Sequence, residues 1–208
     1  MYYKLIYDVV RKNEIYYADL GDQENNIVVI IQNDIGNKYS TTTIVAVIEF
    51  VEKKPIINFN KIYTIEKKRL TRKINKIIPN QIIEIGLRKS LFKKEDKENN
   101  RGKIVFVNLE KGIGSEQSGK RPVILLQNKF HNNSIIVAMI TSVMQKRNLP
   151  VHYVIDSEIS KLPHKSIILL EQLKSVNKDN FIKYVSQIND ADMMSIDNCL
   201  KISLGINF

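Results

Sequence analysis

The residues best suited to chemistry in this sequence lie in one glycine-rich loop, Gly114–Pro122, which reads GSEQSGKRP. Arg121 carries a planar guanidinium, whose fork of donors matches the oxygens of a phosphate group. Ser115 and Gln117 can hydrogen-bond to a phosphate, a sugar or a base edge, and the glycines let the backbone approach a ligand closely. Taken alone, such a loop is more often an ordinary surface loop, so the hypothesis of a site depends on its neighbours.

Two apolar segments that follow this loop end in polar residues. Thr141 and Ser142 follow one of them, and Glu171 and Gln172 follow the other. Because strand ends and loops of a small barrel meet at one rim, these side chains can gather near Arg121. A hydroxyl, a guanidinium and a carboxamide together would suit an RNA phosphodiester. The alternative for Thr141 is that threonine simply favours strands.

The histidines provide a rival set of reactive groups. Two histidines can cleave RNA as acid and base near neutral pH. His131, His152 and His164 lie in unrelated segments with no shared spacing. The spacing therefore favours the glycine-rich loop over the histidines.

The elements that must position these residues are mostly strands. Short aliphatic or β-branched segments, separated by Gly, Pro, Asn and Ser, cover residues 103–109, 122–127, 135–140, 151–155 and 167–170. This pattern predicts a small barrel or a strongly curved sheet. Towards the end of the chain, Asn189 or Asp190 can cap a helix in which Met193, Ile196 and Leu200 recur at helical spacing. We expect this helix to pack on the barrel.

The two halves of the chain resemble each other, block by block and in the same order. The matching pairs are Ile15–Leu20 with Ile104–Leu109, Val28–Asn33 with Val123–Asn128, Ile44–Ile48 with Ile136–Ile140, and Ile62–Lys67 with Leu173–Lys178. Such ordered similarity predicts a duplication. The charged run Arg88–Glu98 predicts a solvated boundary. We therefore expect a domain over 1–92, a linker over 93–100 and a second domain over 101–208.

Composition limits the classes of protein that fit. The 208 residues suffice for two domains. Thirty-two basic and 22 acidic residues give a net charge of +10, which attracts polyanions such as nucleic acid. No apolar run is long enough to cross a bilayer, and no signal peptide is evident. Cys199 is the single cysteine, which excludes an internal disulfide framework and suggests a cytoplasmic protein.

The second half resembles the MazF/PemK toxin family over essentially all of residues 101–208. The stretches that carry the resemblance are Arg101–Leu109, Gly114–Gln117, Arg121–Val123, Gln127–Asn128, Ile136–Ala138, Ile140–Ser142, Leu149–His152 and Leu169–Gln172. The resemblance implies a mainly β fold with helices, here as two small SH3-like, MazF-like barrels in tandem. It implies metal-independent cleavage of single-stranded RNA without a cofactor, a cognate antitoxin protein and a symmetric homodimer.

The resemblance also implies roles for individual residues. The family's catalytic Arg and Thr fall on Arg121 and Thr141. The predicted substrate contacts are Ser115, Glu116, Gln117, Ser142 and Gln172. Because a guanidinium stays protonated at neutral pH, Arg121 is expected to stabilise the transition state and Glu116 to be a candidate proton acceptor. His152, in the LPVH stretch, is a candidate contact for RNA or a partner.

The first half departs from the family pattern at the reactive positions. By register, Asn26 replaces Arg121 and Glu49 replaces Thr141. A carboxylate repels phosphate, and the segment equivalent to Leu149–Ile155 is missing. We expect a degenerate, non-catalytic copy that pairs with the second half as an intramolecular pseudo-dimer, unless the chain forms a homodimer.

Two further features leave alternatives open. Residues Lys53–Lys76 hold nine basic side chains and one acid, Glu66, which fits either a solvated face or a track for RNA backbone. The whole chain could also be an inactive relative that binds RNA or an antitoxin, or a topoisomerase poison similar to CcdB. The intact loop Gly114–Pro122 together with Thr141 favours an endoribonuclease.

Overall fold

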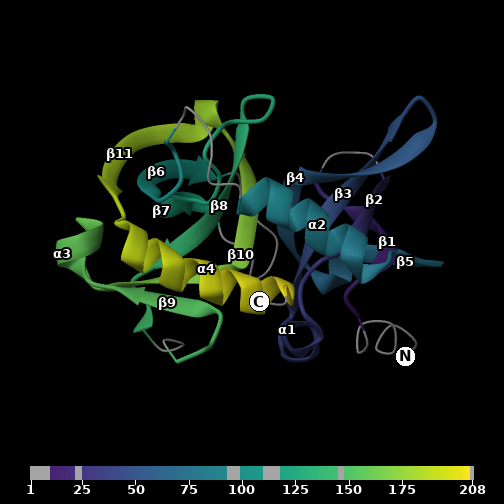
Figure 1. Cartoon of the computed structure of the whole chain (residues 1–208), viewed down its shortest axis with the longest axis horizontal. Helices are drawn as coiled ribbons and strands as arrows, with labels where there is room; N and C mark the ends of the chain where they lie inside the picture. Colours follow the sequence, from purple (N-terminus) through teal and green to yellow (C-terminus); the bar gives the residue numbers. More distant parts are fainter. Residues whose placement is uncertain (1–9, 22–24, 93–98, 110–117, 145–147, 207–208) are drawn as a thin grey trace.

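The fold is mainly antiparallel β-sheet with a few helices, which confirms the predicted fold class (Figure 1). The computed structural model of the chain describes residues 10–21, 25–92, 99–109, 118–144 and 148–206. None of its described helices is both long and apolar enough to span a membrane.

Each half contributes strands in a similar order and ends in a helix. The first half contains β1 (Glu14–Asp19), β2 (Asn25–Ile30), α1 (Asp34–Tyr39), β3 (Thr42–Val51), β4 (Lys54–Glu66), η1 (Lys67–Arg69), β5 (Leu70–Ile77) and α2 (Asn80–Leu91). The second contains β6 (Lys103–Leu109), β7 (Gly119–Leu125), β8 (Ser134–Thr141), β9 (His152–Ile155), α3 (Ser157–Ser160), β10 (Ser166–Asn177), η3 (Lys178–Asn180), β11 (Phe181–Gln187) and α4 (Asp190–Leu204). The predicted strands and final helix are present, but β10 is longer than expected and β11 was not predicted.

The strands form one sheet, and the strands of the two halves follow each other in equivalent order when the sheet is read inwards from its two edges. The order is β11-β6-β7-β8-β10-β4-β3-β2-β1-β5, and β9 pairs with β10 beside this path. Each strand of one half thus occupies the place of its counterpart in the other half. Figure 1 shows that the sheet curls around each half instead of lying flat.

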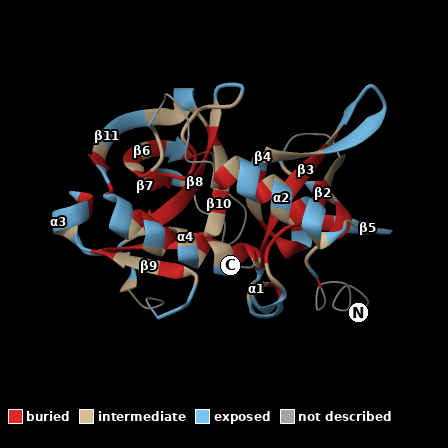
Figure 2. Cartoon of the chain, in the orientation of Figure 1, coloured by how far each residue is buried: buried red, intermediate tan, exposed pale blue. Residues whose placement is uncertain are grey.

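Alternate residues of the central strands face two different cores. On β7, Val123 and Leu125 pack in a cluster of the second half, whereas Ile124 packs in a larger cluster that includes residues of both halves. On β2, Val28 packs in a cluster of the first half, and Val29 packs in the larger cluster. The strands are apolar without interruption because both of their faces are buried (Figure 2).

A bulge also recurs at the same place in each half. The register of β3 with β4 shifts between Ala46 and Val47, and that of β8 with β10 shifts between Ala138 and Met139. Each shift inserts extra residues into the longer strand of the pair. A bulge of this kind bends a strand locally. The same irregularity in both halves supports a common architecture.

The two halves meet along β4 and β10, where Tyr63 pairs with Lys174. Beside this pair, the Thr64 hydroxyl donates to the carbonyl of Glu171 at 3.1 Å. The same hydroxyl accepts the amide of Leu173 at 2.8 Å. One side chain of β4 therefore satisfies two backbone groups of β10.

Ser175 makes the reciprocal contacts from the other side. Its hydroxyl donates to the carbonyl of Asn60 at 2.8 Å and accepts the amide of Ile62 at 2.9 Å. Ser175 follows Lys174 as Thr64 follows Tyr63, so the two hydroxyls occupy equivalent positions. The junction is self-complementary, which is the pattern that a two-fold axis produces between identical subunits.

A second reciprocal contact involves the ends of the two long helices. Lys12 donates to the carbonyl of Gly205, at the end of α4, at 2.8 Å. Arg101, at the equivalent position of the second half, donates to the carbonyl of Leu91, at the end of α2, and pairs with Asp197. Each cation thus binds the carboxyl-terminal end of the other half's helix, where the helix dipole favours positive charge.

Candidate active site

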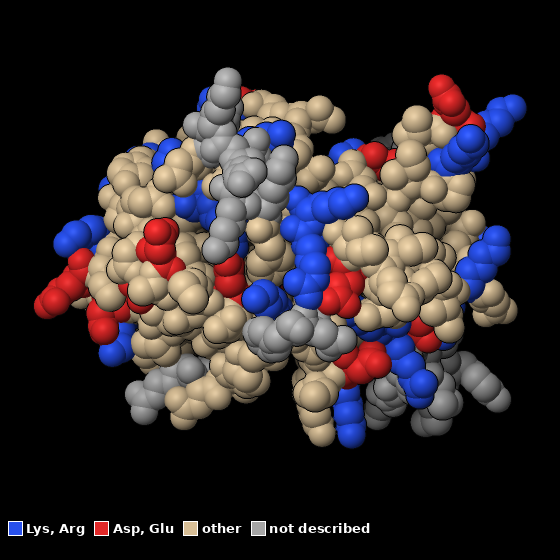
Figure 3. Space-filling model, viewed as in Figure 1, with Lys and Arg blue, Asp and Glu red and all other residues tan. Residues whose placement is uncertain are grey.

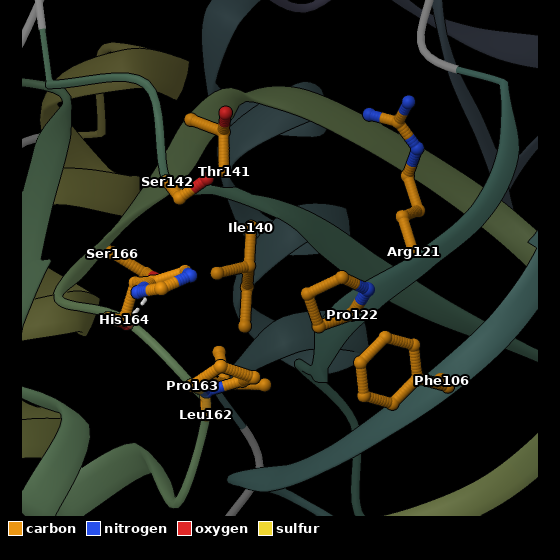
Figure 4. Close-up of a pocket in the computed structure, with 10 residues that line it drawn as sticks. All are labelled: Phe106, Arg121, Pro122, Ile140, Thr141, Ser142, Leu162, Pro163, His164 and Ser166. Carbon is orange, nitrogen blue, oxygen red and sulfur yellow. Dashed lines mark hydrogen bonds between the residues drawn. The ribbon is translucent and has the colours of Figure 1, made fainter.

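A pocket of about 270 Å³ lies in the second half, between β7, β8 and the segment that leads into β10. Its lining residues are Phe106, Arg121, Pro122, Ile140, Thr141, Ser142, Leu162, Pro163, His164 and Ser166 (Figure 4). The structure therefore brings together three of the residues that the sequence singles out, namely Arg121, Thr141 and Ser142.

Arg121 and Thr141 meet because β7 and β8 are hydrogen-bonded neighbours. Val123 pairs with Met139, and continuing this antiparallel register places Arg121 opposite Thr141. Figure 4 shows both side chains reaching the same end of the pocket. Two neighbouring strands of the core therefore carry a guanidinium and a hydroxyl to the same pocket.

The guanidinium of Arg121 is oriented by its own loop. Its Nε and Nη2 atoms donate to the carbonyl of Ser118 at 3.0 and 2.6 Å. Partial burial lowers the pKa of Arg121. Arginine nevertheless remains a cation at neutral pH, so the pocket contains a positive charge with several donors suited to a phosphate.

Two hydroxyls line the same pocket as this cation. The Oγ1 atom of Thr141 accepts the backbone amide of Val143 at 3.2 Å, which leaves the hydroxyl proton to be donated elsewhere. Ser142 is exposed at the pocket. Both hydroxyls can hydrogen-bond to an anion bound near Arg121.

The opposite wall of the pocket is the short segment between α3 and β10. Leu162 is buried in the large core cluster and anchors the segment. Ser166 donates from Oγ to the carbonyl of His164 at 2.9 Å, so the backbone is tied at both ends. His164 itself is exposed, and its ring points into the pocket (Figure 4). Sequence spacing alone did not indicate that His164 would lie with Arg121 and Thr141.

The remaining predicted site residues lie elsewhere or are not described. Gln172 lies half-buried in the bulged region of β10 and does not line this pocket. Its contact with RNA stays a prediction. Ser115, Glu116 and Gln117 fall outside the described residues, and their roles stay predictions too.

The other two histidines are separate from the pocket. His152 is 6% exposed, and its Nε2 lies 2.8 Å from Oε1 of Glu171. Because it is buried in a pair of this kind, His152 has a packing role, and the idea that it contacts RNA or a partner is wrong. His131 forms a bridge with Ser134 in the connection between β7 and β8.

The equivalent position of the first half has different chemistry. Val28 pairs with Val47, and continuing this register places Asn26 opposite Glu49. Lys61 and Asn58 donate to the Glu49 carboxylate at 2.6 and 2.9 Å, and these hydrogen bonds hold its pKa below the usual range. An ionised carboxylate disfavours phosphate at this position.

The first half also lacks one wall of the pocket. Its β3 passes to β4 through a tight turn at Glu52 and Lys53, which have φ angles of 48° and 66°. In the second half β9 and α3 are inserted at this point. The predicted absence of the Leu149–Ile155 counterpart is confirmed.

The basic stretch of the first half is only partly available to a ligand. Lys67 is buried and donates to the carbonyl of Asn37, and Arg69 is buried with Nε 2.5 Å from the carbonyl of Asp19. The hypothesis that these two residues line an RNA track is therefore wrong. Figure 3 shows that basic side chains gather along the middle of one face, with acidic ones among them. Within the described part of the chain, no cluster of three or more His, Cys, Asp or Glu could hold a metal ion.

Comparison with known proteins identifies relatives of the half that contains the pocket. The family model for the PemK-like, MazF-like toxin of type II toxin–antitoxin systems matches residues 100–204. Endoribonuclease EndoA of Bacillus subtilis is 38% identical over 109 residues, which cover 51% of this chain and 94% of that protein.

Solved structures of toxins match the same share of the chain. MazF from Deinococcus radiodurans is 16% identical, with a TM-score of 0.45, and covers 53% of this chain and 100% of its own. The Mycobacterium tuberculosis toxin MazF-mt6 is 16% identical, with a TM-score of 0.43, and covers 51% of this chain and 99% of its own.

Proposed function

The chain belongs to the PemK-like, MazF-like toxin family of type II toxin–antitoxin systems, and we propose that it is an endoribonuclease that cleaves single-stranded RNA. The observation that carries this proposal is the placement of Arg121 opposite Thr141 at one pocket. The similarity to endoribonuclease EndoA supports the same reaction. The intact pair favours an enzyme over an inactive RNA- or antitoxin-binding relative and over a topoisomerase poison.

In the proposed reaction the 2′-hydroxyl of RNA attacks the adjacent phosphorus, and the bond from phosphorus to the 5′-oxygen breaks. The products are a 2′,3′-cyclic phosphate and a 5′-hydroxyl. Negative charge grows on the phosphoryl oxygens in the transition state. In this proposal Arg121 and Thr141, which line the same pocket, donate hydrogen bonds to these oxygens and stabilise the developing charge.

Substrate contacts surround these two residues in our proposal. Ser142 lines the pocket and can hydrogen-bond to the phosphate or the ribose. The predicted contacts of Ser115, Glu116, Gln117 and Gln172 add recognition of bases and sugars. The net charge of +10 draws RNA to the protein through its phosphates. Because the chemistry uses the 2′-hydroxyl and protein side chains, the proposed cleavage needs neither metal nor cofactor.

The proposed organisation is a degenerate MazF-like domain over 1–92, a linker over 93–100 and the endoribonuclease domain over 101–208. The reciprocal contacts of Thr64 and Ser175 support a first half that takes the place of a second subunit. A self-complementary interface can be satisfied within one chain when two copies are joined, and tethering raises the effective concentration of the partner. The chain would then act as an intramolecular pseudo-dimer with one reactive pocket.

The family assignment also gives a partner and a place of action. Since the family model describes toxins of type II toxin–antitoxin systems, we propose a cognate antitoxin protein as the second partner. The cytoplasm, where RNA is made and translated, is the proposed place of action.

The test is cleavage of a pool of single-stranded RNA by the full chain in excess EDTA, with sequencing of the cut ends. We expect cleavage at selected sites that leaves cyclic phosphate and 5′-hydroxyl ends. Double-stranded RNA of the same sequence should resist. No cleavage of any single-stranded RNA would contradict the proposed function, and cleavage that EDTA abolishes would contradict the proposed metal independence.

A further inference from the structure

We propose that His164 is the general base that removes the proton from the 2′-hydroxyl, an inference that rests on the proposed RNA cleavage. The reaction cannot start unless this proton leaves the nucleophile. Arg121 is a permanent cation and cannot accept it, and neither Thr141 nor Ser142 is basic enough. Glu116, the candidate proton acceptor from the sequence, lies outside the described residues. Of the described residues that line the pocket, His164 is the one that carries an imidazole, the side chain used most often for general acid–base catalysis.

The backbone holds His164 in place although its side chain is exposed. Ser160, at the end of α3, is fully buried, and its carbonyl accepts the Ser186 hydroxyl at 2.6 Å. Leu162 is 5% exposed within the core, and Ser166 is bonded to the His164 carbonyl. The imidazole therefore extends into the pocket from a segment anchored on both sides. Such anchoring is what a proton acceptor needs to reach a fixed substrate atom.

Charged groups of both signs lie on the segments around the pocket. They are Arg121 on β7, Lys183 over the Phe106 ring, and Asp156, Glu158, Lys161 and Lys165 near α3. Lys165 is paired with Asp156 at 2.9 Å. Of these residues, Arg121 lines the pocket together with His164 and can neutralise the phosphoryl oxygens.

The proposed step balances as follows. An unprotonated ring nitrogen of His164 takes the proton of the 2′-hydroxyl while the 2′-oxygen forms its bond to phosphorus. The bond from phosphorus to the 5′-oxygen breaks, and the electron pair leaves with that oxygen. Water protonates the 5′-oxygen, and the imidazolium later returns its proton to solvent. Arg121 stays protonated throughout and neutralises the phosphoryl oxygens.

The experiment measures kcat/KM of the full chain against pH, for the wild type and for His164→Ala, with and without added imidazole. The wild-type rate should fall as the pH drops through the range in which imidazoles become protonated. His164→Ala should lose about 100-fold or more in rate and lose this dependence on pH. Free imidazole should restore part of the rate in proportion to the concentration of its neutral form. His131→Ala is the matched control and should keep the wild-type rate and pH profile.

Each alternative result has a clear meaning. A His164→Ala enzyme that keeps the wild-type rate and pH profile, while Arg121→Ala is inactive, would overturn the inference and leave the proposed function intact. A wild-type rate that falls with rising pH, with that limb lost in His164→Ala, would make His164 an acid and would also overturn it. A wild-type chain that cleaves no RNA would instead refute the proposed function. Because His164 is exposed, thermal unfolding of the variant should match the wild type.

Discussion

Thr64 and Ser175 make the same pair of hydrogen bonds in opposite directions across the junction between β4 and β10. Each hydroxyl donates to a carbonyl of the facing strand and accepts one of its amides. The two residues differ in type but not in role. A two-fold relationship is therefore built into one chain. At the junction, side-chain hydroxyls make hydrogen bonds to backbone groups of the facing strand.

The junction should lose stability when these hydroxyls are removed. Thr64→Val keeps the shape of the side chain but leaves a carbonyl and an amide of β10 without this partner. We expect a loss of about 1–3 kcal/mol in the free energy of unfolding, since an unsatisfied, partly buried polar group loses its hydration without compensation. Ser175→Ala should behave alike. Urea denaturation followed by circular dichroism measures both.

The matched control for the junction is Thr71→Val. The Thr71 hydroxyl donates to the carbonyl of Tyr17 at 3.2 Å, but it is exposed and lies within the first half. Its removal should change stability by no more than about 0.5 kcal/mol. Equal losses for Thr71→Val and Thr64→Val would show that the junction hydroxyls have no special importance.

Catalysis should depend on the pair that faces the pocket from β7 and β8. Arg121→Ala should lower kcat by about 100- to 1,000-fold, the usual effect of removing one preorganised donor to a developing charge. Arg121→Lys keeps the charge but loses the planar fork, so it should be intermediate. Thr141→Val should be impaired, and Thr141→Ser, which restores the hydroxyl, should recover most of the rate. Single-turnover cleavage of a short RNA is the measurement, and a fully active Arg121→Ala variant would rule out this site.

Sequence reasoning succeeded where local pattern decides structure. The short aliphatic segments that form β6, β7 and β8, and the spacing of Met193, Ile196 and Leu200 on α4, can be seen in the sequence because strands and helices differ in composition and period. Asn189, one of the two predicted caps, accepts the amide of Asp192 at 2.9 Å and starts the helix. These features depend on neighbours in the chain.

What the sequence could not indicate depends on long-range placement. Thr64 and Ser175 look like ordinary strand residues, because nothing local shows that β4 and β10 pair. Strand β11 was missed because Phe181–Gln187 alternates weakly and includes the exposed Ile182, Lys183 and Tyr184. His164 reaches the pocket only through the way α3 and Leu162 anchor its segment. Lys67 and Arg69 are charged residues whose burial depends on acceptors far away in the sequence.

Stability should fall in acid because of Glu14, a buried carboxylate on β1. Burial alone would raise its pKa, but hydrogen bonds from Lys73, the Arg11 amide and Tyr16 outweigh this effect, so the pKa lies below its ordinary value of 4.5. Because the pKa of Glu14 is lower in the folded state than in the unfolded state, the ionised carboxylate stabilises the fold. This contribution is fully present when the pH is above the ordinary pKa of the group. This contribution is lost as the pH falls through the folded-state value.

Glu14→Gln tests this dependence by urea denaturation between pH 7 and pH 3. The variant should have a lower free energy of unfolding than the wild type at pH 7. The difference between the two free energies should become smaller as the pH falls. Glu52→Gln, in the exposed turn between β3 and β4, is the control and should run parallel to the wild type. A gap for Glu14→Gln that stays constant across this range would show that the carboxylate does not titrate with folding.

A second active site should not arise from restoring only the two facing residues of the first half. Asn26→Arg with Glu49→Thr would recreate the pair formed by Arg121 and Thr141 at the same register. In an Arg121→Ala background, this double substitution should still give no cleavage. The first half passes from β3 to β4 in a tight turn, so it has no counterpart of the wall formed by Leu162, Pro163, His164 and Ser166. Without this wall, a phosphate can be attracted but the nucleophile has no fixed base.

The same double substitution in a chain that keeps Arg121 should retain near wild-type cleavage, which shows that it does not unfold the protein. If the grafted chain lacking Arg121 cleaved RNA within about tenfold of the wild type, the facing pair alone would suffice, and the requirement for the second wall, with His164 in it, would be wrong.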